Sequence, residues 1–134
     1  MQARGIHHLG VAVEDLDSAL VTYERLFGAQ IERRATVGDQ GVRAASVRIG
    51  ESRVELLEPL GEDTPVGRFL AKRGPGMHHV AYEVTDLETA LAELTDAGAD
   101  LIDEAPRAGL FGLEVAFVHP DSVHGVLSEV VSVA

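Results

Sequence analysis

The sequence predicts an α+β fold made of two βαβββ modules, and three observations support this prediction. First, residues 7–20 and 78–91 align without a gap at an offset of 71 residues, and each segment begins with a His-His pair. Self-similarity at a fixed period indicates a structural repeat. Second, each segment passes from an apolar-rich strand pattern to helical spacing. Third, each is followed by three short strand-like stretches separated by glycine or proline.

The first module is predicted at about residues 5–60. Its helix has apolar residues at helical spacing from Leu16 to Phe27. Asp15 is expected to cap the start of this helix, and Gly28 can end it in the left-handed conformation. The predicted strands of this module cover about 5–13, 29–37, 42–49 and 53–59.

The second module is predicted at about residues 77–132, with a helix that stops at Gly98 as the first one stops at its own glycine. A linker of about residues 61–76 joins the modules, and a short helix is expected to start at Thr64 and to end before Gly74. The predicted strands of the second module cover about 77–84, 99–104, 113–119 and 125–132.

Composition limits the class of protein. The 134 residues, 46% of them hydrophobic, suit a single domain over residues 1–134 with a real core. A net charge of −11 argues against a nucleic-acid partner. There is no cysteine, so disulfides and thiolate metal sites are excluded. No apolar stretch reaches the ~20 residues of a membrane span. Residues 1–5 do not resemble a secretory signal, so we expect a cytoplasmic protein.

The His-His pairs at 7–8 and 78–79 are the first candidates for chemistry. Neighbours in a strand point to opposite faces, so one His of each pair, the equivalent one, should face inward. Glu55 and Glu129 lie in apolar surroundings in the last strand of each module, where a buried carboxylate is costly unless it is paired or binds a metal. The alternatives are a duplicated structural His pair and solvent-facing glutamates. Together, two imidazoles and two carboxylates suit Zn²⁺, Co²⁺, Mn²⁺, Ni²⁺ or Fe²⁺.

The chain resembles the vicinal oxygen chelate superfamily, which contains glyoxalases, bleomycin resistance proteins and dioxygenases, and within it the methylmalonyl-CoA epimerase family. The most specific segments are 54–66, which contains Leu-Leu-Glu-Pro-Leu, and 69–81, which leads into the second His-His pair. The resemblance continues in residues 6–13, 117–120 and 124–129.

By position in these motifs, the resemblance implies that His8, Glu55, His79 and Glu129 bind a divalent metal ion (Co, Mn, Zn or Ni) in a cup-shaped, eight-stranded half-barrel. It implies an isomerase, a metal-dependent epimerase that interconverts (2R)- and (2S)-methylmalonyl-CoA. Such an enzyme removes the proton at C2 and stabilises the resulting enolate with the metal. The resemblance also implies an acyl-CoA substrate and a homodimer.

The group that removes the proton stays open at this point. Some relatives have a glutamate where this chain has Ala44, so the base must lie elsewhere. Glu129 and Glu55 are candidates, acting from the metal as in glyoxalase I. Glu58 is a further candidate, although strand alternation puts it on the face opposite Glu55.

Two other functions also remain open. The same fold could serve another metal enzyme, either a glyoxalase-like isomerase or a non-haem iron dioxygenase, and a dioxygenase would leave Glu55 without a role. Alternatively, the chain could be a non-catalytic module that binds a small molecule. Lys72 and Arg73 are candidates for contacts to coenzyme A phosphates, with solvated surface as their alternative role.

Overall fold

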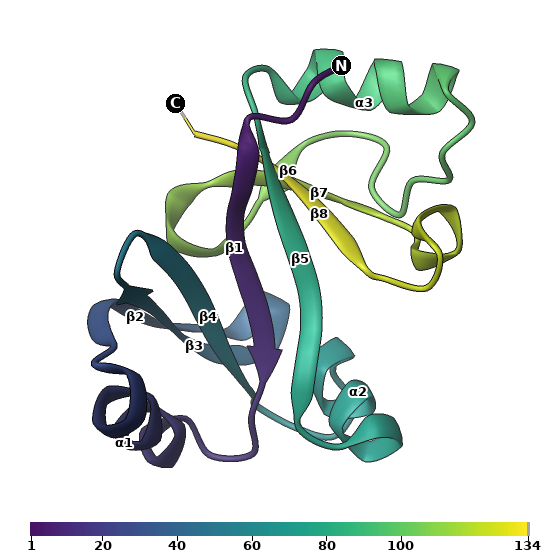
Figure 1. Ribbon diagram of the computed structural model, residues 1–134. Coiled ribbons are helices and arrows are strands. Elements are labelled where there is room, and N and C mark those ends of the chain that lie inside the picture. Colours follow the sequence, from purple (N-terminus) through teal and green to yellow (C-terminus); the bar gives the residue numbers. More distant parts are fainter. Residues whose placement is uncertain (134) are drawn as a thin grey trace. The chain divides into compact units, whose positions relative to one another are not determined.

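The computed structural model describes residues 1–133, and the chain divides into two compact units. We call residues 8–78 the N-terminal unit, and residues 1–7 with 79–134 the C-terminal unit. The boundaries fall inside β1 and β5, between the two histidines of each His-His pair. The elements are β1 (Gly5–Ala12), α1 (Leu16–Phe27), β2 (Gln30–Val37), β3 (Val42–Ile49), β4 (Ser52–Pro59), α2 (Pro65–Arg73), β5 (Gly76–Val84), α3 (Leu87–Asp96), β6 (Arg107–Ala108), β7 (Glu114–Val118) and β8 (Ser128–Ser132), as labelled in Figure 1.

The N-terminal unit is built on β2, β3 and β4, three strands of eight residues each. β3 pairs antiparallel with both β2 and β4, and β4 pairs in parallel with β1. Helix α1 packs against β3 and β4 (Figure 1). Their shared core contains Leu16, Leu20, Ala45, Val47 and Leu56. This packing explains the apolar stripe that the sequence shows along the helix.

The C-terminal unit has the same connectivity with shorter outer strands. β5 pairs in parallel with β8, β8 pairs antiparallel with β7, and the two-residue β6 pairs antiparallel with β7. Helix α3 packs against β7 and β8 through a core of buried apolar residues. These are Val84, Leu87, Ala90, Leu91, Ala116 and Val130.

The helix signals in the sequence are confirmed. The side chains of Asp15 and Asp86 each accept a hydrogen bond at 3.0 Å from the backbone N–H three residues later, which caps α1 and α3. Gly28 ends α1 in the left-handed conformation, with φ of 66°. The predicted linker helix is α2, and the Thr64 hydroxyl caps it. Helix α3 ends at Asp96, two residues before the predicted glycine stop.

The predicted strand at 99–104 is wrong. In this segment Leu101 forms an isolated bridge to Val118, while Ile102 and Asp103 both donate backbone hydrogen bonds to the Phe117 carbonyl. The Asp103 side chain in turn accepts the N–H of Phe117 at 2.8 Å. These local bonds take the place of a regular ladder, and the short β6 follows at residues 107–108.

The α+β class and the two βαβββ modules are confirmed. Hydrogen bonds link the eight strands in the order β2-β3-β4-β1-β5-β8-β7-β6, and β1 and β5 each carry residues of both units. The single-domain boundaries stay a prediction. Within the described residues, no helix combines the length and the apolar character needed to cross a membrane.

Candidate functional site

The N-terminal unit buries a histidine beside a glutamate. His8 lies on β1 and Glu55 on the parallel strand β4, and both side chains are buried. His8 Nε2 lies 3.4 Å from Glu55 Oε1. Burial is the main cause that lowers the pKa of His8; the Glu55 carboxylate opposes this shift and Arg53 adds to it. A neutral imidazole with its Nε2 next to a carboxylate is a suitable arrangement for metal binding.

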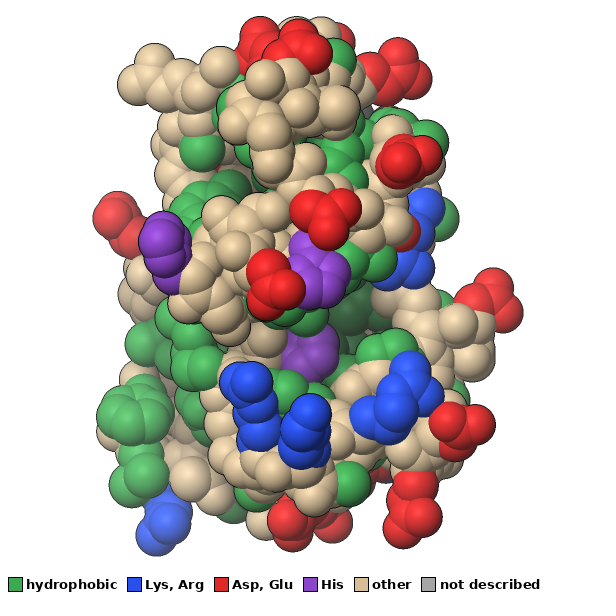
Figure 2. Space-filling model, turned by 90° about the vertical axis from the view of Figure 1, so that its right-hand side faces the viewer, with side chains coloured by type: hydrophobic (Ala, Val, Ile, Leu, Met, Phe, Trp, Pro, Cys, Tyr) green, Lys and Arg blue, Asp and Glu red, His purple; other side chains and the backbone are tan. Residues whose placement is uncertain are grey.

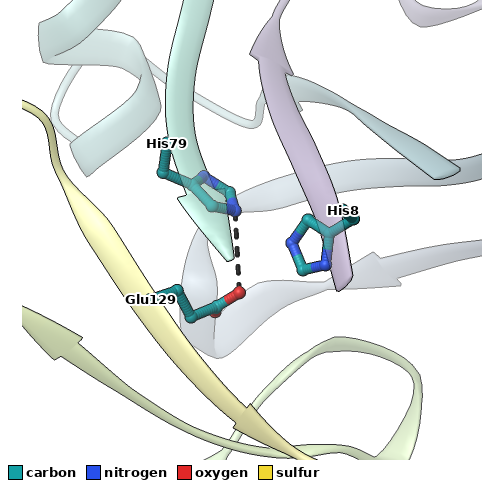
Figure 3. Close-up of side chains that lie close together, drawn as sticks. All are labelled: His8, His79 and Glu129. Carbon is teal, nitrogen blue, oxygen red and sulfur yellow. Dashed lines mark ion pairs between the residues drawn. The ribbon is translucent and has the colours of Figure 1, made fainter. Parts of the chain in front are cut away.

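The C-terminal unit holds a second pair of the same kind. His79 lies on β5 and Glu129 on the parallel strand β8, both buried, with His79 Nε2 3.7 Å from Glu129 Oε1 (Figure 3). Burial raises the pKa of Glu129 to about 8, which Arg107 partly offsets.

The two pairs occupy equivalent positions in their strand registers. Glu55 lies opposite Gly10, and Glu129 lies opposite Ala81. In each case the histidine precedes the opposing residue by two positions, so it shares a face of the sheet with the glutamate. The repeat in the sequence is therefore also a repeat of side-chain geometry.

Comparison with known proteins places this geometry in a family. Residues 7–117 match the family model of the Glyoxalase/Bleomycin resistance protein/Dioxygenase superfamily. The ethylmalonyl-CoA/methylmalonyl-CoA epimerase of Cereibacter sphaeroides is 36% identical, over 92% of this chain and 94% of the relative. The mitochondrial methylmalonyl-CoA epimerase of Bos taurus is also 36% identical, over 92% of this chain and 71% of the relative. The chain belongs to the methylmalonyl-CoA epimerase family.

Solved structures of this family agree closely with the fold. A Streptomyces coelicolor methylmalonyl-CoA epimerase variant in complex with 2-nitronate-propionyl-CoA superposes with a TM-score of 0.95 at 36% identity, covering 99% of this chain and 96% of that one. The methylmalonyl-CoA epimerase of Mycobacterium tuberculosis gives a TM-score of 0.94 at 34% identity, covering 98% and 89%.

The other histidines of the two pairs have different surroundings. His7 and His78 are half-buried, whereas His8 and His79 are buried, as strand alternation predicts. The His78 ring packs edge-on against Phe69 of α2, with 5.0 Å between centroids, and burial lowers the pKa of His78. This contact ties β5 to α2 within the N-terminal unit.

The structure also shows the surroundings of Ala44, where some relatives have a glutamate, and of Glu58, the further candidate for the base. Ala44 is fully buried opposite Leu57 and has no group to carry a proton. Glu58 accepts the N–H of Leu16 at 2.8 Å through Oε1 and pairs with Arg43 at 3.2 Å through Oε2. Glu58 thus stabilises the N-terminus of α1, where a carboxylate is favoured by the helix dipole.

In the N-terminal unit, Arg53 is bound to a carboxylate that sequence reasoning missed. Arg53 Nε donates to Glu32 Oε1 at 2.8 Å, and the buried Ser46 hydroxyl donates to the same oxygen at 3.2 Å. Ser46 lies opposite Glu55 in the β3–β4 register. Hydrogen bonding to Arg53 holds the pKa of Glu32 below its usual range. No motif marks Glu32, because its contacts join three strands far apart in sequence.

In the C-terminal unit, a second arginine, Arg107, is anchored beside the pair. Arg107 Nε lies 3.2 Å from Asp103 Oδ2, and its guanidinium lies 5.5 Å from the centre of the Phe117 ring. The Phe117 ring meets the His79 imidazole edge-on at 5.7 Å, and Phe117 lies opposite Glu129 in the β7–β8 register. Sequence reasoning missed this cluster because Asp103 lies in the segment wrongly predicted as a strand.

Three of the four side chains in the His–Glu pairs form a group that could hold a divalent metal ion. His8, His79 and Glu129 are buried residues that could hold one, and imidazole nitrogen with carboxylate oxygen suits the first-row divalent ions. Glu129 is buried, and a buried carboxylate is costly unless an opposite charge lies nearby. A bound cation would supply that charge.

The basic residues Lys72 and Arg73 lie in the last turn of α2, and both are exposed. Figure 2 shows Lys and Arg side chains gathered in the lower part of the face it presents, where α2 lies. Cations in the last turn of a helix interact favourably with the negative end of its dipole, so the position of Lys72 and Arg73 has a structural explanation.

Proposed function

We propose that this protein is a divalent-metal-dependent epimerase that interconverts (2R)- and (2S)-methylmalonyl-CoA. The observation that carries the proposal is the pair of buried His–Glu arrangements at equivalent register positions, His8 with Glu55 and His79 with Glu129. Membership of the epimerase family supports the choice of substrate. Retention of all four side chains favours a metal enzyme over a binding module.

We further propose that the two pairs serve one metal ion. Four protein ligands on a six-coordinate ion leave two positions for a chelating substrate, which suits a thioester oxygen and a carboxylate oxygen. When bound, the metal supplies positive charge that stabilises the enolate formed at C2. Co²⁺, Mn²⁺, Zn²⁺ and Ni²⁺ all accept this nitrogen and oxygen set, and cobalt is one of the four to be tested.

The glutamates of the pairs are the candidates for proton transfer. Glu129 is the first candidate for the base, because it is buried beside His79 and could act when released from the metal. Glu55 is the second candidate and would act at the opposite side of C2. The histidines hold the geometry and stay neutral, as the lowered pKa of His8 favours.

The decisive experiment uses solvent deuterium. Metal-loaded protein is incubated with (2R)- or (2S)-methylmalonyl-CoA in D₂O, and C2 is followed by NMR and mass spectrometry. We expect deuterium at C2 and conversion to the other epimer. Absence of exchange with all four metal ions would refute the proposed reaction. Oxygen consumption by the Fe²⁺-loaded protein would instead favour a dioxygenase.

The cytoplasmic location and the homodimer stay predictions. Light scattering coupled to size exclusion tests the dimer, with a mass of about twice the 14.3 kDa of one chain as the expected result.

A further inference from the structure

Two contacts hold the cation of Arg107 beside the His79–Glu129 pair. Its Nε is engaged by Asp103, and its guanidinium lies over the Phe117 ring. Phe117 in turn contacts the His79 ring and lies opposite Glu129 across the β7–β8 ladder. Aspartate and aromatic ring together restrict the plane of the guanidinium, so it is preorganised for a planar partner.

The outer end of this guanidinium is available for a ligand. Among residues 1–133, the ion pair of Arg107 uses Nε, and its two terminal amino groups have no carboxylate partner. The side chain is 49% exposed. Arg53, the corresponding cation of the N-terminal unit, differs in both respects. It is 27% exposed and reaches Glu32 through Nε and NH2.

A negatively charged substrate needs such a cation. The chain has a net charge of −11, and Glu129 itself would repel a second carboxylate nearby. A guanidinium holds several N–H donors in one fixed plane, so it can donate to a single carboxylate oxygen in a set direction, whereas lysine acts as a point charge. In the proposed reaction one carboxylate oxygen of the substrate goes to the metal, which leaves the other oxygen in need of a donor.

We propose that Arg107 binds the free carboxylate of the malonyl group and thereby distinguishes dicarboxylic acyl-CoA substrates from simple acyl-CoA molecules. This inference rests on the proposed function and assigns Arg107 as a specificity residue of the same site. The contact with Phe117 keeps the guanidinium next to the His79–Glu129 pair, while the ion pair with Asp103 fixes its rotation.

The test compares two ligands that differ by one carboxylate. Binding of methylmalonyl-CoA and of propionyl-CoA to the metal-loaded protein is measured by calorimetry for wild type, Arg107→Gln and Arg107→Lys. We expect Arg107→Gln to weaken the binding of methylmalonyl-CoA by about 10- to 100-fold and to change the affinity for propionyl-CoA by no more than about twofold. Arg107→Lys should bind methylmalonyl-CoA more tightly than Arg107→Gln but less tightly than wild type, because lysine keeps the positive charge and lacks the planar set of N–H donors.

Arg4→Gln is the matched control, since it removes an exposed cation of the same unit whose partner is Glu83. Equal losses for both ligands would overturn the inference and would place Arg107 at a coenzyme A phosphate or in a structural role. Unchanged affinity for both ligands would also overturn it. If Arg107→Gln does not fold, Arg107→Lys alone decides, because a selective loss for methylmalonyl-CoA is still expected. Failure of wild type to exchange deuterium is a different result and refutes the epimerase itself.

Discussion

The two units hold equivalent His–Glu pairs in sheets of unequal size. In the N-terminal unit the outer strands β2, β3 and β4 have eight residues each. In the C-terminal unit β6, β7 and β8 have two, five and five residues. The distance between histidine and glutamate nevertheless stays similar, at 3.4 Å and 3.7 Å.

This difference shows which part of the module positions the pair. The parallel contacts β1–β4 and β5–β8 are retained in both units and set the register of histidine against glutamate. The outer strands can shorten without altering that register. The arginines beside the pairs differ as well: Arg53 of β4 lies 2.8 Å from Glu32, and Arg107 of β6 lies 3.2 Å from Asp103.

The largest expected effect comes from removing one histidine of either pair. If both pairs serve one metal, His8→Ala and His79→Ala should each lower metal affinity by more than about 100-fold, since even loss of an outer partner costs 10- to 100-fold. Metal content after dialysis, measured by mass spectrometry, should fall from one ion per chain to near zero in both variants.

His124→Asn is the control, because His124 is exposed with φ of 56°, a conformation that asparagine tolerates. Its metal content should equal that of wild type. If each histidine variant retained about half of two bound ions, the pairs would be independent sites and the shared centre would be refuted.

The next effect concerns the cores behind the two pairs. Leu56 follows Glu55 and Val130 follows Glu129, and both are buried in the clusters that α1 and α3 cover. Leu56→Ala should lower the free energy of unfolding by about 2–5 kcal/mol. Val130→Ala removes less volume and should cost about 1–3 kcal/mol. Urea unfolding measures both; a larger loss for Val130→Ala would contradict the comparison.

The affinity for metal should depend on pH through Glu129. Because the pKa of Glu129 is raised to about 8, this carboxyl is protonated below that pH and must lose a proton to bind metal. Metal affinity should therefore rise about tenfold per pH unit up to about pH 8, and then level off. The lowered pKa of His8 keeps its imidazole neutral over the upper part of this range.

Without metal, the same shift has the opposite consequence for stability. Between the ordinary pKa of a glutamate and about 8, the folded chain holds a proton that the unfolded chain has lost, so stability falls as pH rises. Competition titrations and thermal unfolding at several pH values measure the two trends. Glu129→Gln should remove this fall in stability with rising pH and leave the contributions of groups such as His8 and Glu32; an equal fall in that variant would contradict the assignment.

The smallest effect should be equal in the two units. Asp15 and Asp86 cap α1 and α3 with the same geometry, at 3.0 Å. Asp15→Ala and Asp86→Ala should each cost about 1 kcal/mol in thermal or urea unfolding, and the double variant should show the sum. A smaller cost at Asp15 would be traced to Glu58, which also accepts an N–H at the N-terminus of α1 and remains when Asp15 is replaced.

Local signals in the sequence were enough for most of the fold. The helix caps, the glycine at the end of α1 and the spacing of apolar residues are short-range features, and the repeat marked His8 and His79 as equivalent. The segment at 99–104 was predicted wrongly, because its backbone donors are taken by Phe117, 14 residues from Asp103. Whether such a segment pairs as a regular strand or forms isolated hydrogen bonds depends on the strand beside it, here β7.

The sequence by itself determined the two modules, the equivalence of the two His-His pairs and the carboxylates Glu55 and Glu129 in apolar strands, because alternation and a gapless repeat depend on neighbours along the chain. The resemblance to the epimerase family selected His8 and His79 from the pairs. Tertiary structure decided the rest. It set the distances of 3.4 Å and 3.7 Å between histidine and glutamate, and through burial it raised the pKa of Glu129. It also placed Glu58 against the N-terminus of α1 and Arg107 over the Phe117 ring. These features join residues from different strands and helices, and their burial and charge exist only once the strands are paired.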